Sequence, residues 1–189
     1  MFKRHLEIAM KVKKPLILHL RGLNATHAAM VIMKDVGLPA DWPIHMHAFT
    51  DSWQECKAWS EEWTGMKFGL VSDHFDNEIA ENLPMDNIVL ETDAPYFLPQ
   101  KIRQFYKAKD WNQRPSVPGD VWFVAQQVAF FKNMTVEEVL QENRKNITAL
   151  YGIPPYSPYP VANVAETATE KEQDDWIHTC TGSFQVCHL

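Results

Sequence analysis

The sequence predicts an α/β fold built on a parallel sheet, and three observations support this assignment. Short apolar runs typical of buried strands recur along residues 16–90. Segments in which apolar residues have helical spacing separate these runs, and this alternation is typical of repeated strand–helix units. Polar residues that can bind metal follow directly after several of the runs, where ligands gather in parallel α/β proteins.

The strands can be placed from local apolar patterning and from the residues that interrupt it. The chain opens in an amphipathic helix, in which Phe2, Leu6 and Met10 share one face, and Pro15 ends that helix. Buried strands are expected at residues 16–20, 44–49, 66–71 and 88–90.

The remaining helices have recognisable start and stop signals. Asn24 is a candidate N-cap for a helix closed by Gly37, and Ser52 is a candidate N-cap for the next helix. Thr135 and Glu138 have the spacing of a capping box. The helices are expected at residues 24–36, 53–63, 76–82, 120–132 and 135–150.

Length and composition indicate a globular domain followed by a different kind of segment. Residues 1–153 contain all the predicted elements, whereas residues 154–189 are rich in proline and then in acidic side chains. We expect residues 154–189 to be a disordered tail. Four strand–helix units do not close a parallel barrel, which needs eight, so the domain is either an open doubly wound sheet or half of a barrel.

Charge and cysteine content limit the binding partners and the cellular compartment that can be expected for the protein. The net charge of −6 does not favour nucleic acid through the bulk field, so a phosphate substrate needs a metal or a local basic patch. Three scattered cysteines argue against a disulfide framework. With no secretory leader and no membrane-length apolar run, we expect an intracellular protein, nuclear or cytoplasmic, without a membrane partner.

Three strand ends carry residues that could bind one divalent cation. His19 follows the first strand, His47 follows the second, and Asp93 follows the fourth. Two imidazoles and a carboxylate at neighbouring strand ends could converge on a metal ion. Glu91 lies two residues before Asp93, and we expect it to be either a functional group or a hydrogen-bond acceptor at the strand end.

Four segments resemble the TatD family of metal-dependent deoxyribonucleases. The first is the strand Pro15–Arg21, and the second is His47–Ser52, which is similar to the family's second single-histidine strand. The third, Leu90–Tyr96 with the string Glu-Thr-Asp-Ala-Pro-Tyr, is the most diagnostic. The fourth, Glu142–Gly152, resembles the end of the family's C-terminal helix. Together these matches cover most of residues 2–153.

The resemblance implies a partial TIM-type (β/α) barrel that contains the last four strands with their helices, over residues 1–153. It implies that His19, His47 and Asp93 are ligands of a divalent cation (Mg, Mn or Zn) and that Asp93 also activates water. In the family, a His-x-His metal pair lies on the first strand and a metal-bridging Glu on a later strand of the first half, and the four strands predicted here do not include those strands. The implied function is a deoxyribonuclease acting on DNA, with weak or no activity in this chain. The alternatives are a non-catalytic half-barrel that binds partners and an amidohydrolase-like amide or ester hydrolase.

Two further groups are candidates for substrate contacts. Arg21 follows His19 by two residues and could bind phosphate or support the mouth of the site. Cations and aromatic residues alternate after the last strand, in a pattern that suits a nucleic-acid strand. These candidates for nucleic-acid binding are Lys101, Arg103, Tyr106, Lys107, Lys109 and Trp111.

A four-stranded half of a barrel has two sheet edges, whereas a closed barrel has none. We therefore expect unpaired edges at the first and fourth strands, and an inner face left bare. The chain is then expected to be marginally stable and to self-associate, aggregate or bind a partner.

Overall fold

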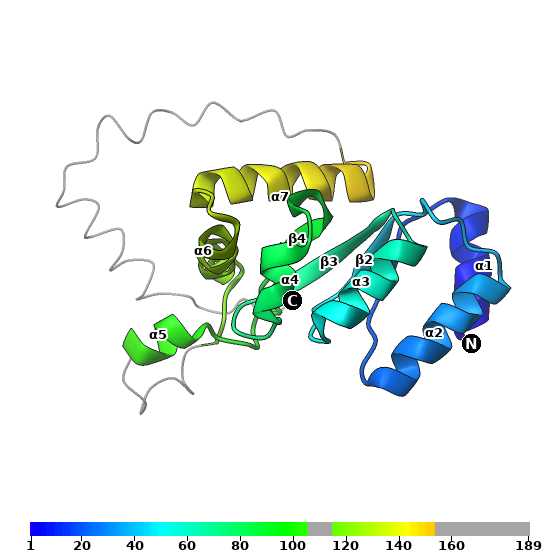
Figure 1. Ribbon diagram of the computed structural model, residues 1–189, viewed down its shortest axis with the longest axis horizontal. Coiled ribbons are helices and arrows are strands. Elements are labelled where there is room, and N and C mark those ends of the chain that lie inside the picture. Colours follow the sequence, from blue (N-terminus) through cyan, green and yellow to red (C-terminus); the bar gives the residue numbers. More distant parts are fainter. Residues whose placement is uncertain (106–114, 154–189) are drawn as a thin grey trace, which may run out of the picture. The chain divides into compact units, whose positions relative to one another are not determined.

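The computed structural model describes residues 1–105 and 115–153, and these form an α/β unit around one parallel sheet (Figure 1). The sheet contains β1 (Leu16–Leu18), β2 (Ile44–Met46), β3 (Met66–Val71) and β4 (Ile88–Glu91). The strands lie side by side in chain order, and every neighbouring pair is parallel. The predicted α/β class and its four parallel strands are confirmed.

Six of the described α-helices lie where they were predicted, with small shifts at their ends, whereas the helix at Gln100–Phe105 lies in a segment after Pro99 for which no helix was predicted. In the described residues the α-helices are α1 (Phe2–Val12), α2 (Leu23–Asp35), α3 (Trp53–Glu62), α4 (Asn77–Asn82), α5 (Gln100–Phe105), α6 (Val121–Lys132) and α7 (Val136–Tyr151). Short 3-10 turns, η1 (Met85–Asn87) and η3 (Pro118–Asp120), precede β4 and α6. None of these helices combines the length and the hydropathy needed to cross a membrane.

Side-chain caps explain two of the helix starts, and a glycine explains a third. Ser52 Oγ accepts the backbone N–H of Glu55 at 3.3 Å, which confirms the predicted start of α3. Thr135 and Glu138 form the predicted capping box of α7. The prediction of Asn24 as the N-cap of α2 is wrong. Gly22 is the N-cap, because its φ of 85° is open to glycine and its carbonyl accepts the first backbone bonds.

Strands β1 and β2 are shorter than predicted because the chain leaves the sheet early. Ala48 has a left-handed φ of 45°, which no strand residue adopts, so β2 ends at Met46. Pairing still continues past the end, since the backbone N–H of His47 donates to the Leu18 carbonyl at 2.9 Å. The break after β2 turns the following loop toward β3, where the Phe49 N–H donates to the Gly69 carbonyl at 2.8 Å.

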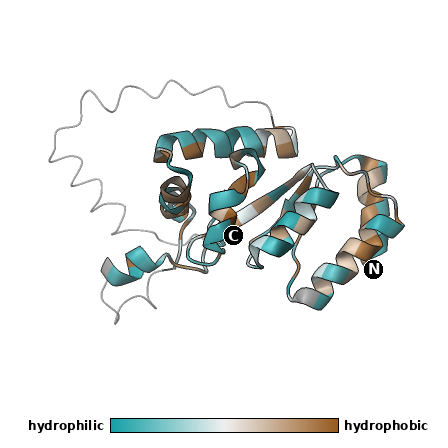
Figure 2. Ribbon diagram, in the orientation of Figure 1, coloured by the Kyte–Doolittle hydropathy of each residue, from teal (hydrophilic) through white to brown (hydrophobic). Residues whose placement is uncertain are grey.

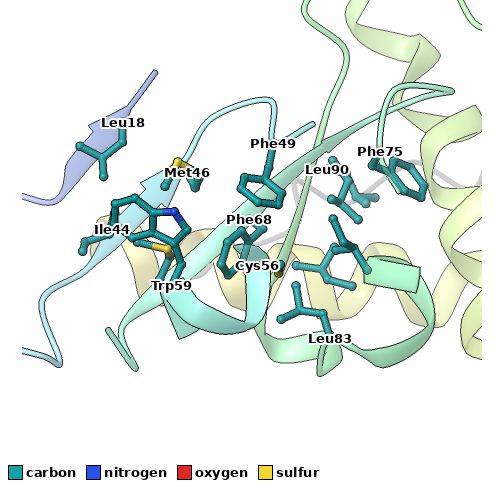
Figure 3. Packing of buried hydrophobic residues seen from close by; sticks show 14 of the residues in the cluster. Leu18, Ile44, Met46, Phe49, Cys56, Trp59, Phe68, Phe75, Leu83 and Leu90 are labelled. Atoms are coloured by element: carbon teal, nitrogen blue, oxygen red, sulfur yellow. The ribbon is translucent and has the colours of Figure 1, made fainter. Parts of the chain in front are cut away.

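The hydrophobic core lies on the face of the sheet that the helices cover. Alternate strand residues such as Ile44, Met46 and Phe68 point into it. Trp59 and Cys56 of α3 pack against these residues (Figure 3). Trp59 and Phe68 are fully buried, so this face supplies most of the apolar burial that holds the unit together.

The opposite face of the sheet carries the polar strand residues. Register places Ile17 of β1, His45 of β2 and Lys67 of β3 in one row on that face. The expectation of a bare inner face holds at Ile17, which is 60% exposed, but fails at Val89, which is 2% exposed.

The two helices α6 and α7 differ in hydropathy. In Figure 2, α6 is largely brown, which marks hydrophobic residues, whereas α7 is mostly teal, which marks hydrophilic ones.

Helix α7 covers the outer edge of β4 with two amide side chains. Asn143 Oδ1 accepts the backbone N–H of Leu90 at 2.9 Å, and Asn146 Nδ2 donates to the Ile88 carbonyl at 2.7 Å. The predicted sheet edge at β4 is present, because no described strand lies beside it, but the two amide side chains occupy two of its backbone groups. Within residues 1–105 and 115–153, the outer edge of β1 has no strand beside it.

Candidate metal centre

Because the strands are parallel, the polar residues at the carboxyl ends of β1, β2 and β4 lie at the same end of the sheet. His19 follows the last residue of β1, His47 follows the last residue of β2, and Glu91 is the last residue of β4. Asp93 lies two residues beyond Glu91, with a left-handed φ of 49°. This conformation is costly for a residue other than glycine, and such residues cluster at functional sites.

Three of these side chains lie close enough to share one cation. His47, Glu91 and Asp93 each offer a ligand atom, and these atoms lie within 4.8 Å of one another. The Nε2 atom of His47 is 3.5 Å from Oδ1 of Asp93, and its Nδ1 atom is 2.7 Å from Oε1 of Glu91. All three residues are partly buried, so their mutual electrostatic interactions are weakly screened.

His19 lies beside this group rather than within it. Its ring centroid is 5.2 Å from that of His47, at an interplanar angle of 37°. The side chain is exposed, whereas His47 is half-buried. The predicted ligands His19, His47 and Asp93 thus lie at the carboxyl ends of the strands. Glu91, the last residue of β4, contacts His47, which follows β2.

Glu91 is held as an ionised acceptor. Burial alone raises its pKa, but the neighbouring imidazoles of His45 and His47 outweigh that effect, and the pKa lies below its ordinary value. The backbone N–H of Ala48 also donates to Oε2 at 2.7 Å. An ionised carboxylate can only accept, so the proton of His47 sits on Nδ1. The Nε2 lone pair then faces Asp93 and is available to a cation.

His45 contacts Tyr151, whereas His47 contacts Glu91. It lies two residues before His47 on β2 and is 8% exposed. Its Nδ1 atom is 2.6 Å from the hydroxyl of Tyr151, at the end of α7. It therefore does not compete with His47 for the strand-end position, and its second nitrogen points toward Glu91 at 3.2 Å.

Arg21 supports a loop of the site. Its Nη1 group donates to the carbonyl of Ala48 at 3.2 Å and to that of Leu20 at 3.0 Å. These bonds tie the end of β1 to the turn after His47. Of the two roles predicted for Arg21, the described contacts favour support of the site's mouth.

Gly69 is a site residue that the sequence analysis did not select. A Cβ atom there would lie 1.8 Å from Oε2 of Glu91 and 2.8 Å from Nε2 of His45. A glycine at the centre of a strand often marks a place where other groups approach closely, and that was the available signal. Gly69 thus provides the space that the polar side chains of β2 and β4 share.

The predicted nucleic-acid segment is only partly described. Lys101 and Arg103 lie on α5, after β4, while Tyr106, Lys107, Lys109 and Trp111 lie outside the described residues. Lys101 also lines a cavity of about 330 Å³ between α6 and the loop after β3. Phe123, Gln126 and Phe130 of α6 line the same cavity, which therefore combines apolar, amide and cationic groups.

The side chains of the site fit a divalent cation. An imidazole whose other nitrogen is bonded to a carboxylate is the usual arrangement of a metal-binding histidine. His47 with Glu91 has this arrangement, and Asp93 adds an oxygen ligand beside the free Nε2. Imidazole and carboxylate donors together suit Zn²⁺, Mn²⁺ or Fe²⁺, and the donor types do not select among them.

Comparison with known proteins gives one consistent match. A family described as TatD related DNase matches residues 1–152. A human protein named 3'-5' RNA nuclease TATDN2 is 30% identical over an alignment of 158 positions that covers 80% of this chain and 20% of that protein. The 3'-5' ssDNA/RNA exonuclease TatD of Erwinia amylovora is 26% identical over 80% of this chain and 58% of its own length.

Solved structures show the same fold at lower sequence identity. The TatD homologue YJJV of Escherichia coli has a TM-score of 0.62 and 21% identity, over 79% of this chain and 54% of that one. A TatD family hydrolase from Entamoeba histolytica also has a TM-score of 0.62, over 55% of its chain. The chain therefore spans about half the length of these bacterial and structural relatives. The four strands correspond to part of a TIM-type barrel, as predicted.

Proposed function

Since the chain belongs to the family of TatD-related deoxyribonucleases, we propose that it carries the C-terminal half of a metal-dependent phosphodiesterase site. Relatives in this family are named as metal-dependent hydrolases and as nucleases of single-stranded DNA and RNA. The proposed substrate is accordingly a single-stranded nucleic acid, DNA in the first place. The observation that carries the proposal is the pairing of His47 Nε2 with Asp93 at 3.5 Å.

Each side chain has a distinct proposed role. His47 would hold the cation through Nε2, and Asp93 would hold it through its carboxylate. His19 can join them by a change of side-chain rotamer, because its ring already lies next to that of His47. A divalent ion at this site would supply Lewis-acid chemistry that makes water easier to deprotonate. The Asp93 carboxylate would accept a proton from water, which is the role of a general base.

The proposed activity of this chain alone is weak or absent. The resemblance implies a His-x-His pair and a bridging Glu on strands of the first half of the barrel, and β1–β4 correspond to the second half. Three ligands hold a cation less tightly than a complete set, and an incomplete set positions substrate phosphate less well. A non-catalytic half-barrel is the second candidate function, and the correspondence of β1–β4 to the second half alone favours it.

Metal titration separates these two candidates. We expect calorimetry with Mn²⁺ and Zn²⁺ to show one site in the wild-type chain. Asp93→Asn should weaken that binding by at least roughly tenfold, the smallest effect typical of changes around a metal site. Asp41→Asn, at an exposed position outside the site, is the matched control and should bind as the wild type does.

A nuclease assay tests the chemistry. Labelled single-stranded DNA and RNA should be cleaved slowly or not at all by this chain, and any cleavage should disappear with EDTA and in Asp93→Asn. In a longer chain that contains the complete barrel, Asp93→Asn should nearly abolish turnover, because an amide cannot accept the proton. Metal-independent cleavage, or full activity of that variant, would contradict the proposal.

A further inference from the structure

His45 is a buried imidazole that is neither a proposed metal ligand nor part of the hydrophobic core. It is 8% exposed and lies on β2, on the face of the sheet away from the helices. The Nδ1 atom contacts the Tyr151 hydroxyl at 2.6 Å. The Nε2 atom lies 3.2 Å from Oε1 of Glu91 but is buried without a well-aligned hydrogen bond among the described residues. A buried polar atom in this state is costly and calls for an explanation.

The neighbouring groups fix the direction of each contact. Oε2 of Glu91 accepts the Ala48 N–H, and Oε1 faces a ring nitrogen of each imidazole, so the His45 proton belongs on Nε2, where it faces the carboxylate. Nδ1 of His45 then accepts, and the Tyr151 hydroxyl must donate to it. Tyr151, His45 and Glu91 therefore form one directed chain of contacts.

This chain of contacts ends at the metal centre. Oε1 of Glu91, the oxygen that faces His45, is also the atom that accepts from Nδ1 of His47 at 2.7 Å. The far end is anchored separately, because Asn143 and Asn146 fix α7 to the edge of β4. Tyr151 is the last residue of α7, so its hydroxyl is held in place by the helix that carries it.

We propose that His45 and Tyr151 are positioning residues, which hold the Glu91 carboxylate so that His47 keeps its proton on Nδ1 and presents Nε2 to the cation. The inference rests on the metal site described above under the proposed function. Neither residue touches the cation. Their effect passes through Glu91, in the way that outer partners orient the ligands of other metal sites. A consequence is that α7 contributes to metal affinity without supplying a ligand.

Two variants remove the chain of contacts and one preserves it. Tyr151→Phe removes only the hydroxyl and leaves the ring, so the packing is retained. His45→Leu removes both nitrogens. His45→Gln can keep the pattern, since its amide oxygen can accept from Tyr151 while its NH₂ group faces Glu91. His27→Leu, at an exposed histidine of α2, is the matched control.

Two readouts on the full 189-residue chain test the proposal. Long-range ¹H–¹⁵N correlation spectra of the metal-free protein report which nitrogen of His47 carries the proton. Calorimetry with Mn²⁺ reports affinity. We expect Tyr151→Phe and His45→Leu to convert His47 to a mixture of tautomers and to weaken Mn²⁺ binding by roughly tenfold, the lower end for outer partners. His45→Gln and His27→Leu should resemble the wild type.

The two proposals fail in different ways. An unchanged His47 tautomer in Tyr151→Phe and His45→Leu would overturn the positioning role, as would a His45→Gln variant that behaves like His45→Leu. If the wild-type chain bound no Mn²⁺, the metal site would be refuted while the tautomer spectra would still decide the positioning role. Should His45→Leu fail to fold, Tyr151→Phe decides alone, because it creates no cavity.

Discussion

Gly69 and Glu91 lie on neighbouring strands so close together that a methyl group on Gly69 would sit 1.8 Å from Oε2 of Glu91. The carboxylate cannot move aside freely, because the Ala48 amide and the His47 ring both donate to it. The absence of a side chain at position 69 is therefore a requirement of the site.

Gly69→Ala should destabilise the chain and disturb the site together. The added methyl group overpacks a buried position, a change that typically costs about 1–3 kcal/mol. Urea unfolding measures the loss, and metal titration measures the displacement of Glu91. Gly119→Ala is the control, since a Cβ there meets no atom within 4 Å. Equal stability of the two variants would show that the space around Glu91 is not tight.

Glu91→Gln should reduce the loss of stability on acidification. The pKa of Glu91 is lowered in the folded chain from its ordinary value of 4.5. Its ionised form therefore stabilises the fold above the unfolded pKa, and this contribution is lost as the pH falls through the lower folded value. The free energy of unfolding should be measured from about pH 7 to about pH 3. The difference between wild type and variant should be largest near about pH 7 and should shrink as the pH falls.

Glu81→Gln serves as the control for this pH series, because Glu81 is exposed on α4. Its profile should run parallel to that of the wild type. A Glu91→Gln profile parallel to both would mean that the carboxylate gains nothing from its imidazole neighbours.

Asn146→Ala should be among the most destabilising changes in α7. The side chain donates to the carbonyls of Ile88 and Met85 at 2.7 and 2.8 Å, and it is 5% exposed. Removing it leaves two buried acceptors without their partner, at a cost of about 2–3 kcal/mol. Thermal or urea unfolding measures the effect. Asn24→Ala, at an exposed position inside α2, should change stability by less than about 0.5 kcal/mol.

Ile17→Lys should lower any tendency of the chain to associate. Ile17 lies in β1, at the edge of the sheet, and is 60% exposed. A lysine at an edge strand opposes pairing with another sheet. Sedimentation velocity over a range of concentrations should show less dimer or aggregate than in the wild type. Val31→Lys, on the exposed side of α2, adds the same charge elsewhere and should leave association unchanged.

Sequence reasoning placed elements well where local signals decide their position. The apolar run of β3 was predicted residue for residue, because Gly65 bounds it and a strand pattern fills it. The starts of α3 and α7 followed from Ser52 and from the Thr135 capping box. The strand-end position of His19, His47 and Asp93 was likewise readable, since parallel strands end at one edge.

The rest depends on contacts between distant parts of the chain. His45 and Tyr151 are 106 residues apart in sequence, and no local pattern links them. The space beside Gly69 exists only because β2 and β4 flank β3. The two asparagines on α7 look like ordinary polar residues until β4 is seen to present its backbone to them.

The coverage of β4 by α7 makes the two sides of the sheet unequal, and this inequality limits the symmetry of any assembly. Head-to-tail addition would join β4 of one copy to β1 of the next and could continue without end, but Asn143 and Asn146 already occupy the Leu90 N–H and the Ile88 carbonyl on that edge. Among the described residues, the outer edge of β1 has no such cover. Pairing of two copies through β1 would relate them by a two-fold axis and set the two strands antiparallel, and such a contact closes as a dimer instead of extending into a filament.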